Sequence, residues 1–78
     1  MASSVLVSVN DSTPTLVFSG TGNVVIRAAS GTMYYGGSNV SASNGLTVLT
    51  LQMNLNSPDE IYAISASGTH NVQVFSAR

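Results

Sequence analysis

The chain has 78 residues, of which 44% are hydrophobic and only 6% are charged, and its formal net charge is −1. It has no cysteine, which excludes disulfides and thiolate metal sites. Its basic side chains are Arg27 and Arg78, which argues against nucleic-acid binding, because displacing counterions from phosphates takes several cations. The apolar content argues against disorder, and no apolar run approaches the roughly 20 residues that span a bilayer, so no membrane partner is expected.

Short strand patterns bounded by turn residues recur through the first half of the chain. Residues 4–9 (SVLVSV) alternate valine with serine and leucine, and residues 15–19 (TLVFS) follow an NDSTP turn cluster. GTGN at 20–23 predicts a turn into a third strand over 24–28, and ASG then leads into a fourth over 32–36. In the third strand, three apolar side chains are expected to share one face: Val24, Ile26 and Ala28.

The second half of the chain holds the clearest strand pattern, LTVLTLQMNL over residues 46–55. Apolar and polar residues alternate there with period two, and the apolar face consists of Leu49, Leu51, Met53 and Leu55. SPDE at 57–60 predicts a tight turn, because too few residues follow before Gly68 for a helix. Strands over 60–65 and 71–77 complete a set of seven. Together they predict an all-β fold, a small antiparallel β-sandwich or barrel, with residues 1–78 as a single domain.

Glycine-containing turns are expected to connect these strands. ASGT occurs at 29–32 and again at 66–69, each time between β-rich runs. The repeat predicts two similar hairpin turns with Gly31 and Gly68 at positive φ. The Asn-Gly pair at 44–45 suits a tight type I′ turn.

The titratable side chains do not form a recognisable catalytic set. His70 is the single imidazole and lies in an SGTHN turn, where we expect it to be exposed to solvent. Asp59 and Glu60 are adjacent, so on a strand they point to opposite faces and make a poor acid/base pair. Gly36-Gly37 lacks the lysine and the following helix of a phosphate-binding loop. We therefore predict that the chain is not an enzyme and has no catalytic residues, cofactor or metal.

Association with other chains is the expected source of additional stability. A domain of this size buries only about 60% of its unfolded surface, so its own core is small. Several apolar residues lie opposite the predicted core faces; a β-bulge or edge packing explains them as well as a subunit interface does. Tyr34 and Tyr35 are strand neighbours, so one ring is expected to face the core and the other to face outward. The candidate interface residues are Leu6, Val17, Val25, Tyr34, Tyr35 and Phe75.

Two longer stretches carry a pattern of turn and strand residues. The first, VVIRAASGTMYYGGSNVSASNG (24–45), has an aromatic residue before Gly-Gly, then a valine, a small hydroxyl residue and Asn-Gly. The second, DEIYAISASGTHNVQVF (59–75), has an acid, an aliphatic-Tyr-Ala core, Ser-Gly-Thr and an alternating strand. Together they resemble a family of small β-rich proteins encoded among the virion structural genes of tailed bacteriophages and prophages. The matching residues are Tyr35, Gly36, Gly37, Val40, Ser41, Asn44, Gly45, Asp59, Ile61, Tyr62, Ala63, Ser67, Gly68, Thr69, Val72 and Val74.

The chain departs from this pattern at 28–31, where AASG stands in the place of an Asn-x-Gly turn. The resemblance implies a capsid decoration or cementing protein, or a minor head or tail component. Its implied partners are the major capsid protein and further copies of itself in a homotrimer. It also implies a place on the capsid surface of the virion after synthesis in the host bacterial cytoplasm.

Two alternatives to a decoration role remain open from the sequence. The chain could be a glycan- or receptor-binding module of a phage fibre or tail, with Tyr34, Tyr35 and the asparagine-rich loop after them as the binding surface. It could also be a folding or oligomerisation module of a larger assembly.

Overall fold

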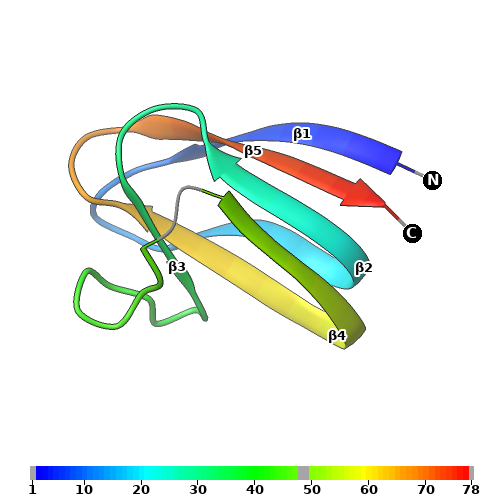
Figure 1. Ribbon diagram of the computed structural model, residues 1–78. Coiled ribbons are helices and arrows are strands. Elements are labelled where there is room, and N and C mark those ends of the chain that lie inside the picture. The colour runs from blue at the N-terminus through cyan, green and yellow to red at the C-terminus, as the bar shows by residue number, and fades with distance from the viewer. Residues whose placement is uncertain (1, 48–49, 78) are drawn as a thin grey trace.

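The computed structural model describes residues 2–47 and 50–77, and in these residues the protein is all-β, as predicted. The strands form one antiparallel sheet in the order β1-β5-β2-β4-β3 (Figure 1). The strands are β1 (Ala2–Val9), β2 (Thr15–Ala28), β3 (Met33–Gly36), β4 (Thr50–Ser65) and β5 (His70–Ala77). β1 and β5 pair along their whole length, from Ala2 opposite Ala77 to Val9 opposite His70.

Five strands replace the predicted seven, because two of the expected turns lie inside strands. GTGN at 20–23 belongs to β2, and SPDE at 57–60 belongs to β4. Gly20 and Gly22 have φ values of 135° and 104°, and the register between β2 and β4 is irregular at this point. A glycine pair and a register irregularity bend a strand without ending its pairing. The strand predicted over 46–55 begins at Thr50, and Leu49 lies outside the described residues.

The bend folds the sheet into two facing arms. The first arm consists of β1, β5, residues 23–28 of β2 and residues 50–55 of β4. The second arm consists of residues 15–20 of β2, residues 59–65 of β4, and β3. Figure 1 shows β2 and β4 curving back together at one end of the molecule. Because one hydrogen-bonded order joins all the strands, the architecture is best described as one sheet folded over itself.

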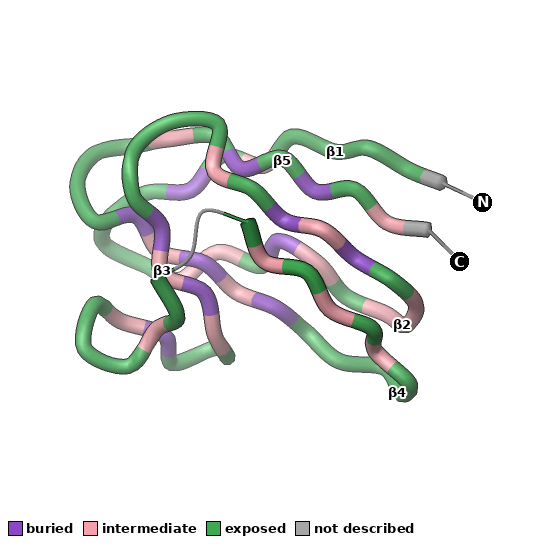
Figure 2. Tube along the Cα trace, viewed as in Figure 1, coloured by how far each residue is buried: buried purple, intermediate pink, exposed green. Residues whose placement is uncertain are grey.

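The core lies between the two arms and draws on all five strands (Figure 2). Its buried members are Val9, Val17, Val24, Ile26, Met33, Tyr35, Ile61, Ala63, Val72 and Val74. The predicted faces are confirmed at Val24 and Ile26, which are buried, and at Leu51, which is half-buried and packs against the cluster. Residues at alternate positions along these strands therefore point outward.

The two ASGT segments adopt the predicted backbone but connect different strands from those expected. Gly31 and Gly68 have φ values of 70° and 71°, which confirms the positive φ. Neither segment is a hairpin turn, because β2 does not pair with β3 and β4 does not pair with β5. Each segment instead crosses from one arm to the other.

The type I′ turn predicted at residues 44–45 is wrong. Such a turn needs positive φ at both central residues, and neither Asn44 nor Gly45 has it. The segment after β3 turns back so that Leu46 forms an isolated bridge with Tyr35, with N–O distances of 3.0 and 2.8 Å. The edge of β3 is thereby partly covered.

Candidate functional site

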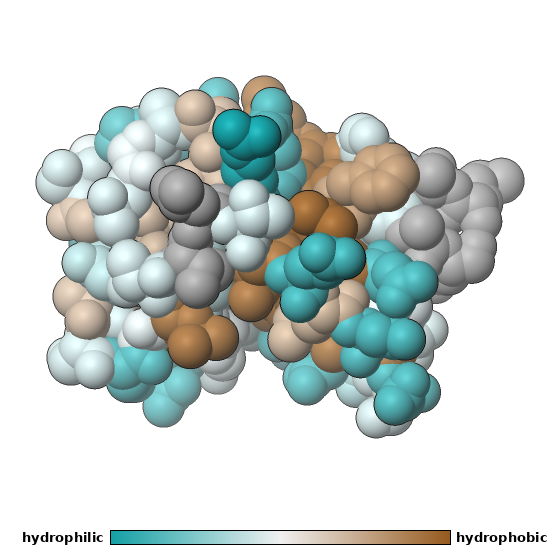
Figure 3. Space-filling model, viewed as in Figure 1, coloured by the Kyte–Doolittle hydropathy of each residue, from teal (hydrophilic) through white to brown (hydrophobic). Residues whose placement is uncertain are grey.

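The outer face of the first arm carries an apolar patch that nothing in the described chain covers. Leu6 is 61% exposed and Phe75 is 47% exposed, and Val25 beside them is half-buried. They lie around a shallow pocket of about 460 Å³. Figure 3 shows apolar surface, in brown, crossing the middle of the molecule in this view. We call this the outer patch and define it as Ser4, Leu6, Val25, Arg27, Gln73 and Phe75.

The strand register places the members of the outer patch in two neighbouring rows. Phe75 lies between Ser4 and Val25 in one row. In the next row, Gln73 lies between Leu6 and Arg27. Directly opposite residues on one face of a sheet are in side-chain contact range, so the rows form one continuous surface. Three of its six members are apolar, so the outer patch is the candidate interaction surface of this arm.

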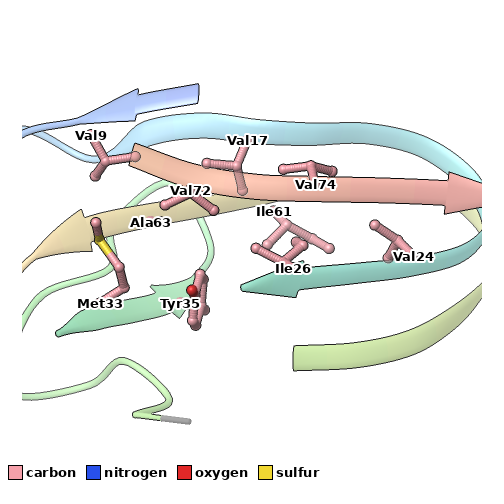
Figure 4. Packing of buried hydrophobic residues seen from close by; sticks show 10 residues of the cluster. All are labelled: Val9, Val17, Val24, Ile26, Met33, Tyr35, Ile61, Ala63, Val72 and Val74. Atoms are coloured by element: carbon pink, nitrogen blue, oxygen red, sulfur yellow. The ribbon is translucent and has the colours of Figure 1, made fainter. Parts of the chain in front are cut away.

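The structure divides the six predicted interface residues. Leu6, Val25 and Phe75 lie together in the outer patch, whereas Val17 and Tyr35 belong to the core (Figure 4). Tyr34 is half-buried on the second arm, so the predicted division between the two tyrosines is confirmed.

Val17 turned inward because of a β-bulge. The register between β2 and β4 runs from Leu16 directly to Phe18, so Val17 is the extra residue of the bulge. Val17 is only 6% exposed, while Leu16 before it is 42% exposed. The prediction that Val17 lies opposite the core is therefore wrong, and the bulge considered as its alternative is present.

A second hollow, of about 220 Å³, lies beside residues 50–55 of β4 and the start of the segment after β3. Its apolar lining includes Leu51, Met53 and Leu55, which the sequence placed on a covered core face. The ring of Tyr35 also lines it, and burial raises the pKa of this phenol. The hydroxyl of Tyr35 is buried and makes no hydrogen bond with the described residues. The sequence could not reveal this hollow, because it depends on how far the two arms separate.

The segment after β3 is held together by hydrogen bonds between its own residues. Asn44 Oδ1 accepts a hydrogen bond from the Ser41 N–H at 2.7 Å, and Asn44 Nδ2 donates to the Asn39 carbonyl at 3.2 Å. A Cβ on Gly45 would lie 2.6 Å from the Cβ of Tyr34. The side-chain amide of Asn44 is thus used within the segment, and the absence of a side chain at Gly45 allows close packing against Tyr34.

His70 joins the two ASGT segments. Its Nε2 donates to the Ser67 carbonyl at 3.0 Å, because a carbonyl can only accept. Its Nδ1 then accepts from the Ser30 hydroxyl at 2.8 Å. The imidazole is half-buried, and a Cβ on Gly31 would lie 2.8 Å from the ring. His70 is thus exposed to solvent only in part, less than predicted, and both ring nitrogens bond to the turns.

The carboxylate of Asp11 also stabilises the end of the molecule where the two ASGT segments lie. Asp11 Oδ2 accepts a hydrogen bond from the Gly68 N–H at 2.8 Å, so it holds a turn and does not orient His70. Ser30 and His70 are in hydrogen-bond range, but the group that orients the imidazole is a backbone carbonyl. This arrangement lacks the carboxylate of a Ser-His-Asp set.

Within residues 2–47 and 50–77, no three histidine, aspartate or glutamate side chains are grouped so that they could hold a metal ion. The same residues contain no helix long and apolar enough to cross a membrane. The chain was compared with family models, with curated proteins and with solved structures, and it matches none of them.

Proposed function

We propose that this chain is a structural protein of a tailed-phage virion, which decorates the outside of the head by binding the major capsid protein, as a homotrimer. The observation that supports this most is the outer patch, an apolar surface on a hydrogen-bonded sheet. The resemblance of residues 24–75 to small virion proteins supports the same role.

The chemistry of the outer patch fits a protein surface as partner. Its single charged side chain is Arg27, and its most exposed apolar members are Leu6 and Phe75. Fully burying a side chain of this kind contributes about 1.5–3 kcal/mol, so burying the exposed part of each contributes about 1 kcal/mol. A protein that bridges neighbouring capsomers through such contacts adds interfaces that pressure or heat must break.

The glycan-binding alternative has less support from the geometry. Its proposed platform needs two accessible aromatic rings, and Tyr35 is only 1% exposed. The amide of Asn44 is engaged by the backbone of its own segment. Tyr34 alone, half-buried, is a small stacking surface.

Co-sedimentation with emptied heads of the phage that encodes the chain tests the proposal. We expect the protein to pellet with heads and to saturate, and Phe75→Ser to weaken binding about fivefold, as the loss of about 1 kcal/mol predicts. Leu16→Ser is the matched control, because Leu16 has a similar exposure, 42%, on the other arm. Protein that stays in the supernatant at all concentrations would refute the decoration role, and equal loss in both variants would remove the outer patch from it.

A further inference from the structure

β1 presents an open edge of the sheet. It pairs with β5 from Ala2 opposite Ala77 to Val9 opposite His70, without a register shift. No described strand pairs with its other side. In an antiparallel pair, every second residue points its N–H and C=O away from the partner strand. Figure 1 shows β1 at the margin of the first arm. Half of its backbone donors and acceptors therefore face outward from the edge.

The two edges of this sheet are protected very differently. β3 has four residues, and Leu46 pairs with its middle. β1 has eight residues, with no charge, no proline and no bulge along them. Lysine, proline, bulges and short length are the usual means by which proteins keep an edge from pairing with another chain. β1 has none of these protections.

The sequence of β1 is self-complementary in the antiparallel sense. Residues 4–8 read SVLVS, which is the same in both directions. If two copies pair about a two-fold axis at Leu6, leucine faces leucine, Val5 faces Val7, and Ser4 faces Ser8. Leucine and serine then occupy the outer face of both copies, and valine occupies the inner face. Because residues 2–10 carry no charged side chain, no like charges meet across this seam.

The same pairing covers the most exposed apolar side chains of β1. Leu6 is 61% exposed and Val5 is 53% exposed. Opposite residues on one face of an antiparallel pair contact each other, so each of these side chains gains an apolar neighbour from the second copy. Leu6 is also a member of the outer patch, which would become continuous across the seam.

We propose that β1 is a self-association edge, through which two copies of the chain pair antiparallel about a two-fold axis at Leu6 and join their sheets into one. The inference does not rest on a virion role. On a capsid, a two-fold contact of this kind would link copies of neighbouring trimers; in solution it joins two copies, whether each is a single chain or belongs to a trimer. Two strands bury less than the roughly 1,200 Å² of a standard interface, so we expect a dissociation constant in the range of about 10 µM to 1 mM.

Sedimentation equilibrium of the full chain tests this contact. From about 10 µM to about 1 mM, the mean mass should rise toward at least twice that of the smallest species present, which is 8.0 kDa for a single chain. Leu6→Lys places two positive charges at the axis and should raise the dissociation constant at least about tenfold. The matched control is Leu16→Lys, which changes an exposed leucine on the other arm and should leave the dissociation constant unchanged.

Single cysteines test the register, because the chain has none of its own. Opposite residues of an antiparallel pair place their Cβ atoms about 4.5–5.5 Å apart, near the reach of a disulfide. Under mild oxidation, Leu6→Cys should form covalent dimers. Val5→Cys mixed with Val7→Cys should cross-link faster than either variant alone.

A mean mass that does not rise up to about 1 mM overturns the proposal, and so does association that Leu6→Lys leaves unchanged. A trimer of unaltered mass in Leu6→Lys would support the trimeric state and reject β1 as the contact. If Leu6→Lys fails to fold, as judged by far-ultraviolet circular dichroism, the cross-linking pattern decides, and equal cross-linking in Leu16→Cys would refute the edge.

Discussion

Gly45 shows how one residue can be required for space and not for backbone freedom. The Asn-Gly pair at 44–45 is a strong turn signal in a sequence, because glycine and asparagine tolerate positive φ. In the structure the pair has no positive φ, and Gly45 packs against Tyr34, Val40 and the Ser41 carbonyl. The sequence identifies the glycine but not which of its two properties the fold uses.

We predict that Gly45→Ala destabilises the protein by about 1–3 kcal/mol, because its Cβ would lie 2.6 Å from the Cβ of Tyr34 and 3.0 Å from the Ser41 carbonyl oxygen. Urea unfolding followed by circular dichroism measures the change. Gly37→Ala is the control, since the nearest atom to its added Cβ, Asn39 Oδ1, is 3.6 Å away. Equal stability of the two variants would contradict the packing role of Gly45.

Tyr35 predicts a dependence of stability on alkaline pH. Burial raises the pKa of its phenol above the ordinary value of about 10. The unfolded chain therefore ionises first, so this contribution to stability is complete below pH about 10 and is lost as the pH rises toward the folded-state pKa. Urea midpoints at pH 8 and pH about 10.5 should differ less in Tyr35→Phe than in the parent chain. An unchanged difference would show that Tyr35 is not the group responsible.

At the scale of the elements, the sequence predicts strands better than it predicts their ends. The period-two pattern correctly gave the inward positions of β2 and β4, at Val24, Ile26 and Leu51. It did not separate a turn from a bend at 20–23, because glycine suits both. The difference depends on whether β4 continues alongside β2, which is a contact between residues far apart in the chain.

The sequence also predicted only part of the candidate site, because alternation is visible along one strand and strand pairing is not. Alternation along a strand placed Leu6, Val25 and Phe75 on the outer face without knowledge of the pairing. It failed at Val17, where one extra residue in β2 reverses the alternation. The strand neighbours of the outer patch could not be predicted, because the order β1-β5-β2 brings the two ends of the chain beside its middle.

The bend in β2 should be sensitive to its backbone angles. Gly20 has a φ of 135°, which side chains other than glycine rarely adopt, while the nearest atom to an added Cβ is 3.8 Å away. Gly20→Ala therefore isolates the backbone cost, which we expect to be about 1–3 kcal/mol. Thermal unfolding compared with Gly37→Ala measures it, and a variant as stable as this control would argue against strain at the bend.

At the scale of the whole molecule, the two arms are tied at both ends. At one end β2 and β4 bend together, and at the other the ASGT segments cross between the arms with His70 between them. Ser65 of β4 also donates its N–H to the Asn10 carbonyl at 2.9 Å, next to β1. The small core is thus enclosed by covalent connections as well as by packing.

We predict that His70→Ala lowers the free energy of unfolding by about 1–3 kcal/mol, because two hydrogen bonds of about 0.5–1.5 kcal/mol each are lost. Ser30→Ala removes one of the two and should cost about half as much. Hydrogen exchange should show the loss of protection at the Ala29 and Ala66 amides, which bond across these segments. Full stability in His70→Ala would mean that the turns hold without the imidazole.

The pairing of Ala2 with Ala77 places the first residue of β1 beside the last residue of β5. Figure 1 shows both ends emerging at the same corner of the first arm. A short linker could join them. A circular permutant with new termini in the surface segment after β3 would then leave every strand intact. The fold is consequently suited to being carried inside a loop of another protein, or to presenting two attached sequences side by side.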